Sequence, residues 1–302
     1  ASCLVGSEMC IRDRINIRIL AENQNLSKFE ITENFTCIRF LDQDKERFEL
    51  EFNLEKGTSF NTFLIRNNEE LFIIHPPEKQ HLNAFIEVLS KFFDQFKLQK
   101  INIISGHINP QIIETIKNIS TQFQNLTIIC SNPGFKLISE LWNQKKPNLE
   151  NFIEIQLPKI NIIKKELHLE LDDIALELIP IPTARWPGGL IIYERNQEIL
   201  LSEKIFSAHI ASEYWSETNR VSTETDRKHF YDCLMAPMSN QVASITEKIA
   251  EYDIKTIAPL HGPAIEYSLK SFLNDYIRWG ENLSTNNPKI ALIYASAYGN
   301  TA

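Results

Sequence analysis

The stretch Ile101-Asn-Ile-Ile-Ser-Gly-His-Ile-Asn-Pro-Gln-Ile112 decides how the rest of the chain is interpreted. Residues 101–104 are a short apolar run, which predicts a buried strand. Pro110 suits the first turn of a helix, where its missing N–H costs no hydrogen bond, so a helix is predicted over residues 110–120. Between the two lies a polar loop that carries His107 and Asn109. The stretch therefore predicts a strand that leads through a polar loop into a helix.

Outward from this stretch, the predicted elements fall into two strand-rich halves, each flanked by helices. The first half has strands predicted at residues 35–41, 47–54, 57–65, 71–74, 101–104 and 126–130, and helices at 81–96, 110–120 and 134–143. The second half has strands at 152–155, 167–171, 175–181, 189–193 and 199–202, and a last strand that ends in a turn at 257–262. Its helices lie within 222–252, with a break near Pro237, and at 264–282. This pattern predicts an α+β fold, specifically a four-layer αββα sandwich of helices on two packed sheets.

Composition excludes several classes of protein. The chain has 302 residues, 43% of them hydrophobic, and a net charge of −8, which argues against a nucleic-acid-binding surface. Its apolar runs are shorter than the roughly 18 residues that a membrane helix needs. The five cysteines form no CxxC pair, which favours a reducing, cytoplasmic setting. Residues 1–14 match nothing downstream, and we interpret them as a non-native scar.

The last residues, Lys289-Ile-Ala-Leu-Ile-Tyr-Ala-Ser-Ala-Tyr-Gly-Asn-Thr-Ala302, have a different character. Residues 290–294 predict a buried strand. The loop that follows can offer backbone N–H groups and hydroxyls to a phosphate; it consists of Ser296, Ala297, Tyr298, Gly299, Asn300 and Thr301. We interpret residues 290–302 as the first strand and loop of a second, truncated domain, joined to the first by a polar linker at residues 284–289.

Several segments together resemble the metallo-β-lactamase-like domain of flavodiiron proteins, and the terminal loop resembles the FMN phosphate loop of the flavodoxin domain that follows in that family. They are Gly57-Thr-Ser-Phe-Asn61, Ser105-Gly-His-Ile-Asn-Pro110, Arg185-Trp-Pro-Gly188, Ile205-Phe-Ser-Ala-His209, Tyr231-Asp-Cys-Leu-Met-Ala-Pro237 and Ala258-Pro-Leu-His-Gly262. The resemblance is to the cyanobacterial, diflavin branch. It implies a metallo-β-lactamase-like domain over residues 30–283, and FMN in the full-length protein but not in this chain.

The resemblance also identifies the positions at which working family members hold two irons. They are His107, Asn109, Gln111, Ile112, Arg185, Lys204 and His261. Only the two histidines keep the family's ligand type. The family's Glu is replaced by Asn109, its two Asp by Gln111 and Lys204, and its two other His by Ile112 and Arg185.

These replacements change the charge of the site. An iron pair needs carboxylates to bridge and neutralise it, and Arg185 and Lys204 would instead repel a cation. We therefore predict that the domain binds neither iron nor zinc in stoichiometric amounts. The resemblance implies instead a cationic pocket of His107, Arg185, Lys204 and His261 that suits an anion. From the residues alone, both cations could equally face solvent.

The other histidines and Cys233 have plainer interpretations. A lone histidine is more often a hydrogen-bonded structural residue than a ligand. We expect His75, His81, His168 and His229 to be loop or surface residues, and Cys233 to be a buried, inert thiol. Only the resemblance suggests that His209 lines the pocket.

Three functional hypotheses follow. In the first, the chain is a subunit of a flavodiiron NAD(P)H:oxygen oxidoreductase whose metal site is degenerate, and it acts in a homo- or hetero-oligomer with a ligand-complete paralogue. In the second, the domain is a non-catalytic interaction or regulatory module with an anion-binding pocket. In the third, Arg185, Lys204 and the two histidines act on an anionic substrate, although no nucleophile with a partnered base supports this. No nucleic-acid or membrane partner is expected.

Overall fold

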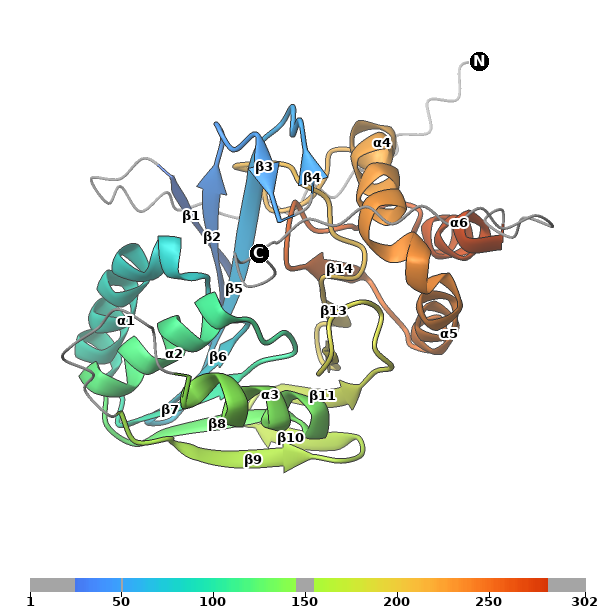
Figure 1. Ribbon diagram of the computed structural model, residues 1–302. Coiled ribbons are helices and arrows are strands. Elements are labelled where there is room, and N and C mark those ends of the chain that lie inside the picture. The colour runs from blue at the N-terminus through green and yellow to red at the C-terminus, as the bar shows by residue number, and fades with distance from the viewer. Residues whose placement is uncertain (1–24, 50, 145–154, 282–302) are drawn as a thin grey trace, which may run out of the picture.

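The computed structural model describes residues 25–49, 51–144 and 155–281, in which helices flank two main β-sheets (Figure 1). The predicted α+β fold with two sheets is confirmed. The predicted scar at residues 1–14, the linker at 284–289 and the flavodoxin-like start at 290–302 lie outside the described residues. Within the described part of the chain, no helix is both long enough and apolar enough to cross a membrane.

The first sheet has seven strands in the order β1-β2-β5-β6-β7-β8-β9. The pairs from β1 to β6 are antiparallel and those from β6 to β9 are parallel. Each parallel connection contains one helix, as a parallel crossover requires. The bounds are β1 Leu26–Thr32, β2 Phe35–Asp42, β5 Thr58–Asn67, β6 Glu70–Ile74, α1 Leu82–Phe96, β7 Lys100–Ile104, α2 Pro110–Gln122, β8 Leu126–Ser131, α3 Asn132–Trp142 and β9 Lys159–Ile163.

The second sheet has five strands in the order β10-β11-β12-β13-β14, and its last pair is parallel. Helices α4 and α5 lie between β13 and β14 in the chain, separated by a π-helical turn and a 3₁₀ turn at the break expected near Pro237. The bounds are β10 Leu167–Leu171, β11 Ile174–Pro180, β12 Leu190–Glu194, β13 Ile199–Glu203, α4 Val221–Phe230, the π turn Tyr231–Met235, the 3₁₀ turn Ala236–Met238, α5 Ser239–Ile249, β14 Thr256–Pro259 and α6 Leu269–Glu281.

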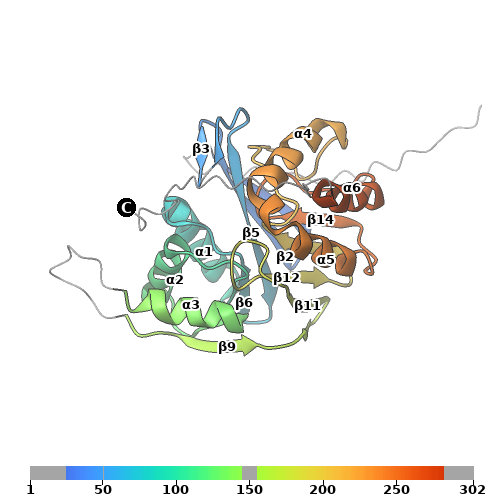
Figure 2. The ribbon, with the colours of Figure 1, turned by 45° about the vertical axis from the view of Figure 1, so that its right-hand side comes forward.

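Alternation along the buried strands divides the core into three clusters. Ile104 of β7 and Ile192 of β12 belong to the cluster between the two sheets. Their neighbours face the other way, because successive strand residues point to opposite faces: Ile103 packs with α1–α3, and Ile191 with α4–α6. Figures 1 and 2 accordingly show α1–α3 and α4–α6 on opposite sides of the molecule.

Arg39 ties the first sheet to the loop after β13. Its guanidinium is fully buried on β2, donates to Oδ1 of Asn61 at 2.7 Å, and also donates to the carbonyls of Ser212, Tyr214 and Trp215. A buried guanidinium needs such acceptors because it cannot lose its charge. The loop is therefore held against the sheet by hydrogen bonds to one side chain.

Parts of the predicted secondary structure were wrong. The expected strand at residues 47–54 is a hairpin, β3 (Arg47–Phe48) and β4 (Glu51–Phe52), because Glu49 has a left-handed φ of 50° that reverses the chain. Strand β1 was missed, so the first sheet begins at Leu26, before the expected domain start at residue 30. Helix α6 begins at Leu269 and not at residue 264, because Ala264 and Ile265 form β-bridges.

Candidate functional site

Lys204 is buried at the end of β13, with only 2% of its side chain exposed. Its Nζ lies 2.5 Å from Oε1 of Glu49, whose side chain is 6% exposed. The same ammonium lies 4.0 Å from the ring centroid of Trp186, a cation–π contact. The hairpin β3–β4 thus supplies the negative charge that a buried lysine needs.

His107 and Asn109 form a second part of the cluster, in the loop between β7 and α2. Oδ1 of Asn109 accepts from the N–H of Ile112 at 2.8 Å and caps α2, which fixes the orientation of the amide. Its Nδ2 can therefore donate both to Oε1 of Glu78 at 3.0 Å and to Nε2 of His107 at 3.1 Å. His107 is then the Nδ1–H tautomer, and this nitrogen has no partner among the described residues.

His261 and His209 approach the cluster from the other side. Nδ1 of His261 donates to the carbonyl of Ser59 at 2.8 Å, which leaves Nε2 without a partner in the described part of the chain. Nε2 of His209 lies 2.5 Å from Oε2 of Glu51, and its Nδ1 lies 2.8 Å from Oγ1 of Thr58. The ring of Phe48 contacts both imidazoles, with centroid distances of 4.9 Å to His209 and 4.8 Å to His261. The hairpin therefore covers the two histidines with an apolar ring.

Burial sets the protonation of these groups. It lowers the pKa of His107 and His261 well below the usual value, and Lys204 lowers both further. Both imidazoles are therefore neutral near pH 7. Burial also raises the pKa of Glu203 to about 8, an effect that Lys204 opposes. The cluster holds fewer charges than its sequence suggests.

The other predicted site residues are less central. Arg185 is half-buried, with its guanidinium carbon 5.3 Å from the centroid of Trp186, whose ring also contacts His107. Ile112 is buried in the core between the first sheet and its helices. Gln111 is half-buried at the start of α2 and has no polar contact with the cluster among the described residues. The structure thus brings together His107, Asn109, Lys204 and His261, with Arg185 beside them across Trp186.

Sequence reasoning missed the side chains that complete the cluster: Phe48, Glu49, Glu51, Glu78 and Trp186. A buried lysine predicts a carboxylate partner but does not say which one. One of the plainer interpretations was wrong, and another was incomplete. His75 lies in the loop after β6, as expected, but it is buried, and burial lowers its pKa to about 3. Cys233 is exposed, because the π turn buries Tyr231, Leu234 and Met235 and leaves the thiol facing outward.

Comparison with known proteins shows the family to which the chain belongs. The model of the family described as ODP family β-lactamase matches residues 58–262. The chain belongs to this family. A relative from Synechocystis sp., named as diflavin flavoprotein A 3, is 33% identical over 88% of this chain and 43% of its own length. The chain spans less than half the length of this relative and of two others named as diflavin flavoproteins.

Two solved structures of ODP-type domains have the same fold. A metal-soaked Flv1 flavodiiron core from Synechocystis sp. is 29% identical, with a TM-score of 0.75 over 85% of this chain and 61% of that one. A fragment of diflavin flavoprotein A 5 from Nostoc sp. is 28% identical, with a TM-score of 0.73 over 85% of this chain and 97% of that one. The chain is therefore a flavodiiron-type metallo-β-lactamase-like domain.

The residues present do not fit the iron pair of this ODP and flavodiiron class. The ammonium of Lys204 is bound to Glu49, and Nε2 of His107 to the amide of Asn109. Among the described residues, the positions that the family resemblance gives to the iron ligands belong to no group of three metal-ligating side chains. Two neutral imidazoles beside an ammonium cannot replace the carboxylates that a hard cation pair requires.

Proposed function

We propose that the chain is the metallo-β-lactamase-like part of a diflavin oxidoreductase, which takes part in O₂ or NO reduction without holding iron in this domain. In this proposal the longer protein binds FMN in its flavodoxin domain and transfers electrons. A partner subunit that keeps the iron ligands carries out the reduction, so the assembly is a hetero-oligomer in which this domain is a scaffold.

The observation that carries the proposal is the buried ion pair of Lys204 with Glu49. At the position that the family resemblance gives to a bridging aspartate, the chain has an ammonium, and a carboxylate from the hairpin neutralises it. Removing Lys204 would leave Glu49 buried without this partner, so the two charges stabilise one another. In this proposal, an ion pair within the domain closes the pocket at the position where the working members hold metal.

Iron loading tests this function. The purified protein is incubated anaerobically with Fe²⁺, desalted and analysed for metal, with a ligand-complete paralogue treated identically. We expect far less than one iron per chain, against two for the paralogue. Co-expression should also recover the paralogue with the full-length protein and raise the rate of NAD(P)H-dependent O₂ consumption. Two tightly bound irons per chain, or a full-length protein that consumes O₂ unaided, would contradict the proposal.

One observation favours the alternative, a regulatory module with an anion site. Nδ1–H of His107 is a buried donor without a partner among the described residues, and Lys204 is close enough to lower the pKa of this imidazole. An anion could accept from both His107 and Lys204 if Glu49 moved aside. Arg185 and His261 would then complete the pocket. The alternative predicts that the wild-type protein binds halide ions measurably, whereas the first proposal does not.

A further inference from the structure

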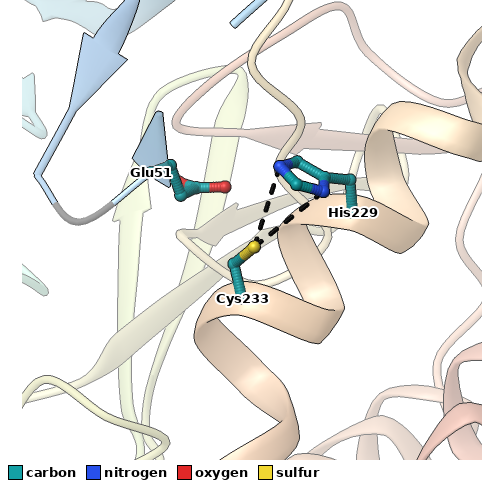
Figure 3. A group of neighbouring side chains, drawn as sticks. All are labelled: Glu51, His229 and Cys233. Atoms are coloured by element: carbon teal, nitrogen blue, oxygen red, sulfur yellow. Dashed lines mark hydrogen bonds between the residues drawn. The ribbon is translucent and has the colours of Figure 1, made fainter. Parts of the chain in front are cut away.

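Glu51, His229 and Cys233 come together beside the closed pocket, and none of them is a former iron-ligand position (Figure 3). Glu51 lies on β4, His229 in the last turn of α4 and Cys233 in the π turn that follows. One ligand atom from each lies within 4.8 Å of the other two. The hairpin thus places a carboxylate against an imidazole and a thiol that are four residues apart.

One oxygen of the Glu51 carboxylate has a hydrogen-bond partner, and the other has none among the described residues. The residue is 2% exposed, and its Oε2 lies 2.5 Å from Nε2 of His209. Its Oε1 is buried and has no hydrogen-bond partner in the described residues, and Figure 3 shows the carboxylate pointing toward His229 and Cys233. A buried carboxylate oxygen without a donor is costly, so something is needed on that side.

The spacing of the other two ligand atoms suits a metal ion. Sγ of Cys233 lies 3.7 Å from Nε2 and 3.9 Å from Nδ1 of His229. A tetrahedral Zn²⁺ with Zn–S near 2.3 Å and Zn–N near 2.05 Å separates sulfur from nitrogen by about 3.6 Å. The distance therefore suits one shared ion. Because Sγ is almost equally far from both ring nitrogens, the exposed imidazole has to turn so that one nitrogen points at the ion. A π turn at this point is also a common feature of functional sites.

We propose that Glu51, His229 and Cys233 bind one Zn²⁺ ion, with water in the fourth position. Thiolate, imidazole and carboxylate are a ligand set that zinc accepts, and three protein ligands leave one open site. Thiolate and carboxylate together balance the charge of the ion, and the thiol proton passes to solvent on binding. His209 orients the carboxylate from behind, as partners of metal ligands commonly do.

This site departs from the expectation that the domain binds no zinc, because that expectation was argued only from the positions that the resemblance gives to the iron site. It is independent of the proposed function, because neither Lys204 nor His107 takes part. If Cys233→Ser loses zinc while its iron content stays that of the wild type, the zinc site is separate from the proposed function.

The test is titration of the purified full chain with Zn²⁺ against a competing chelator, and with Co²⁺ as a spectroscopic probe. We expect one zinc per chain, and a Co²⁺ derivative with a thiolate charge-transfer band and the visible bands of a tetrahedral ion. Cys233→Ser and His229→Gln should each weaken zinc binding at least about tenfold, since even outer partners of metal ligands contribute about 10–100-fold.

Controls separate this site from other thiols and histidines. Cys3→Ser with Cys10→Ser, and His168→Gln, should leave the zinc affinity unchanged. Circular dichroism of each variant checks that the fold is kept, and because His229 and Cys233 are exposed their substitution should be tolerated. Zinc affinity equal to wild type in Cys233→Ser, or a Co²⁺ spectrum without a thiolate band, would overturn the proposal.

Discussion

Lys204 and Glu49 are separated by 155 residues, yet Nζ of one lies 2.5 Å from Oε1 of the other, and both side chains are almost completely buried. The pair forms because the left-handed conformation of Glu49 turns β3 back into β4 above the end of β13. The ammonium and the carboxylate therefore balance each other's charge inside the pocket.

Lys204→Met should destabilise the domain by about 3–5 kcal/mol, because Glu49 would be left buried without its partner. Urea unfolding followed by circular dichroism measures this change. In the double variant Glu49→Gln, Lys204→Met, most of the loss should be recovered. The matched control is the exposed pair of Lys56 with Asp226, where Lys56→Met should cost less than about 1 kcal/mol. Equal losses at the two lysines would show that Lys204 is solvated.

Glu49→Gln should convert the cluster into a halide site, because Lys204 then lacks its carboxylate. Chloride should therefore raise the melting temperature of this variant more than gluconate does at the same ionic strength. Asp226→Asn, which frees the exposed Lys56, should show no such preference. An equal response to both salts in Glu49→Gln would rule out an anion pocket at Lys204.

Glu203→Gln should flatten the pH dependence of stability. The folded-state pKa of Glu203 is about 8, above its ordinary value of 4.5, because the carboxyl is buried. Its contribution to stability is therefore full below about pH 4.5, declines as the pH rises, and is lost above about pH 8. Between about pH 4.5 and pH 8, the free energy of unfolding of the variant relative to wild type should rise by up to about 1.4 kcal/mol per pH unit. Urea unfolding at several pH values measures it, and a constant difference would contradict it. Glu55→Gln, at an exposed position, is the control.

Restoring the family's ligands should create iron affinity if the backbone has kept the family's geometry. The substitutions are Asn109→Glu, Gln111→Asp, Ile112→His, Arg185→His and Lys204→Asp. Anaerobic Fe²⁺ at about 100 times its dissociation constant should then stabilise the variant by about 2.7 kcal/mol, as a thermal shift. Ile112 is a core residue, so a four-fold variant that keeps it guards against misfolding. Variants that fold but bind no iron would show that the hairpin has remodelled the pocket.

Local sequence predicted those elements whose own residues determine their structure. The alternation in Leu167–Leu171 gave β10 with the bounds that the structure has, and helical spacing gave α1 to within one residue. Pro110 marks the start of α2 in the sequence as it does in the structure, where Asn109 also caps the helix. These signals lie within a few residues of the element they define.

Where distant contacts decide, local sequence fails. Lys100–Ile104 and Lys159–Ile163 have the same five residues, Lys-Ile-Asn-Ile-Ile, yet the first is the buried strand β7 and the second is the largely exposed edge strand β9. Only the first was predicted. The prediction of the candidate site was incomplete for the same reason. Its positions could be aligned with a family, but the partners of Lys204 and Asn109, which are Glu49 and Glu78, come from other segments of the chain. Their approach depends on the fold as a whole.

Arg39 has a consequence for how fast the domain folds and unfolds. The carbonyls that it binds lie 173 to 176 residues further along the chain, so these bonds close one of the longest loops in the domain. Contacts of such sequence separation carry a large loop-closure entropy and are costly to form early. If they form after the rate-limiting step, Arg39→Met will accelerate unfolding and leave the refolding rate almost unchanged. The lifetime of the native state would then depend on the guanidinium of Arg39, although the rate of folding would not.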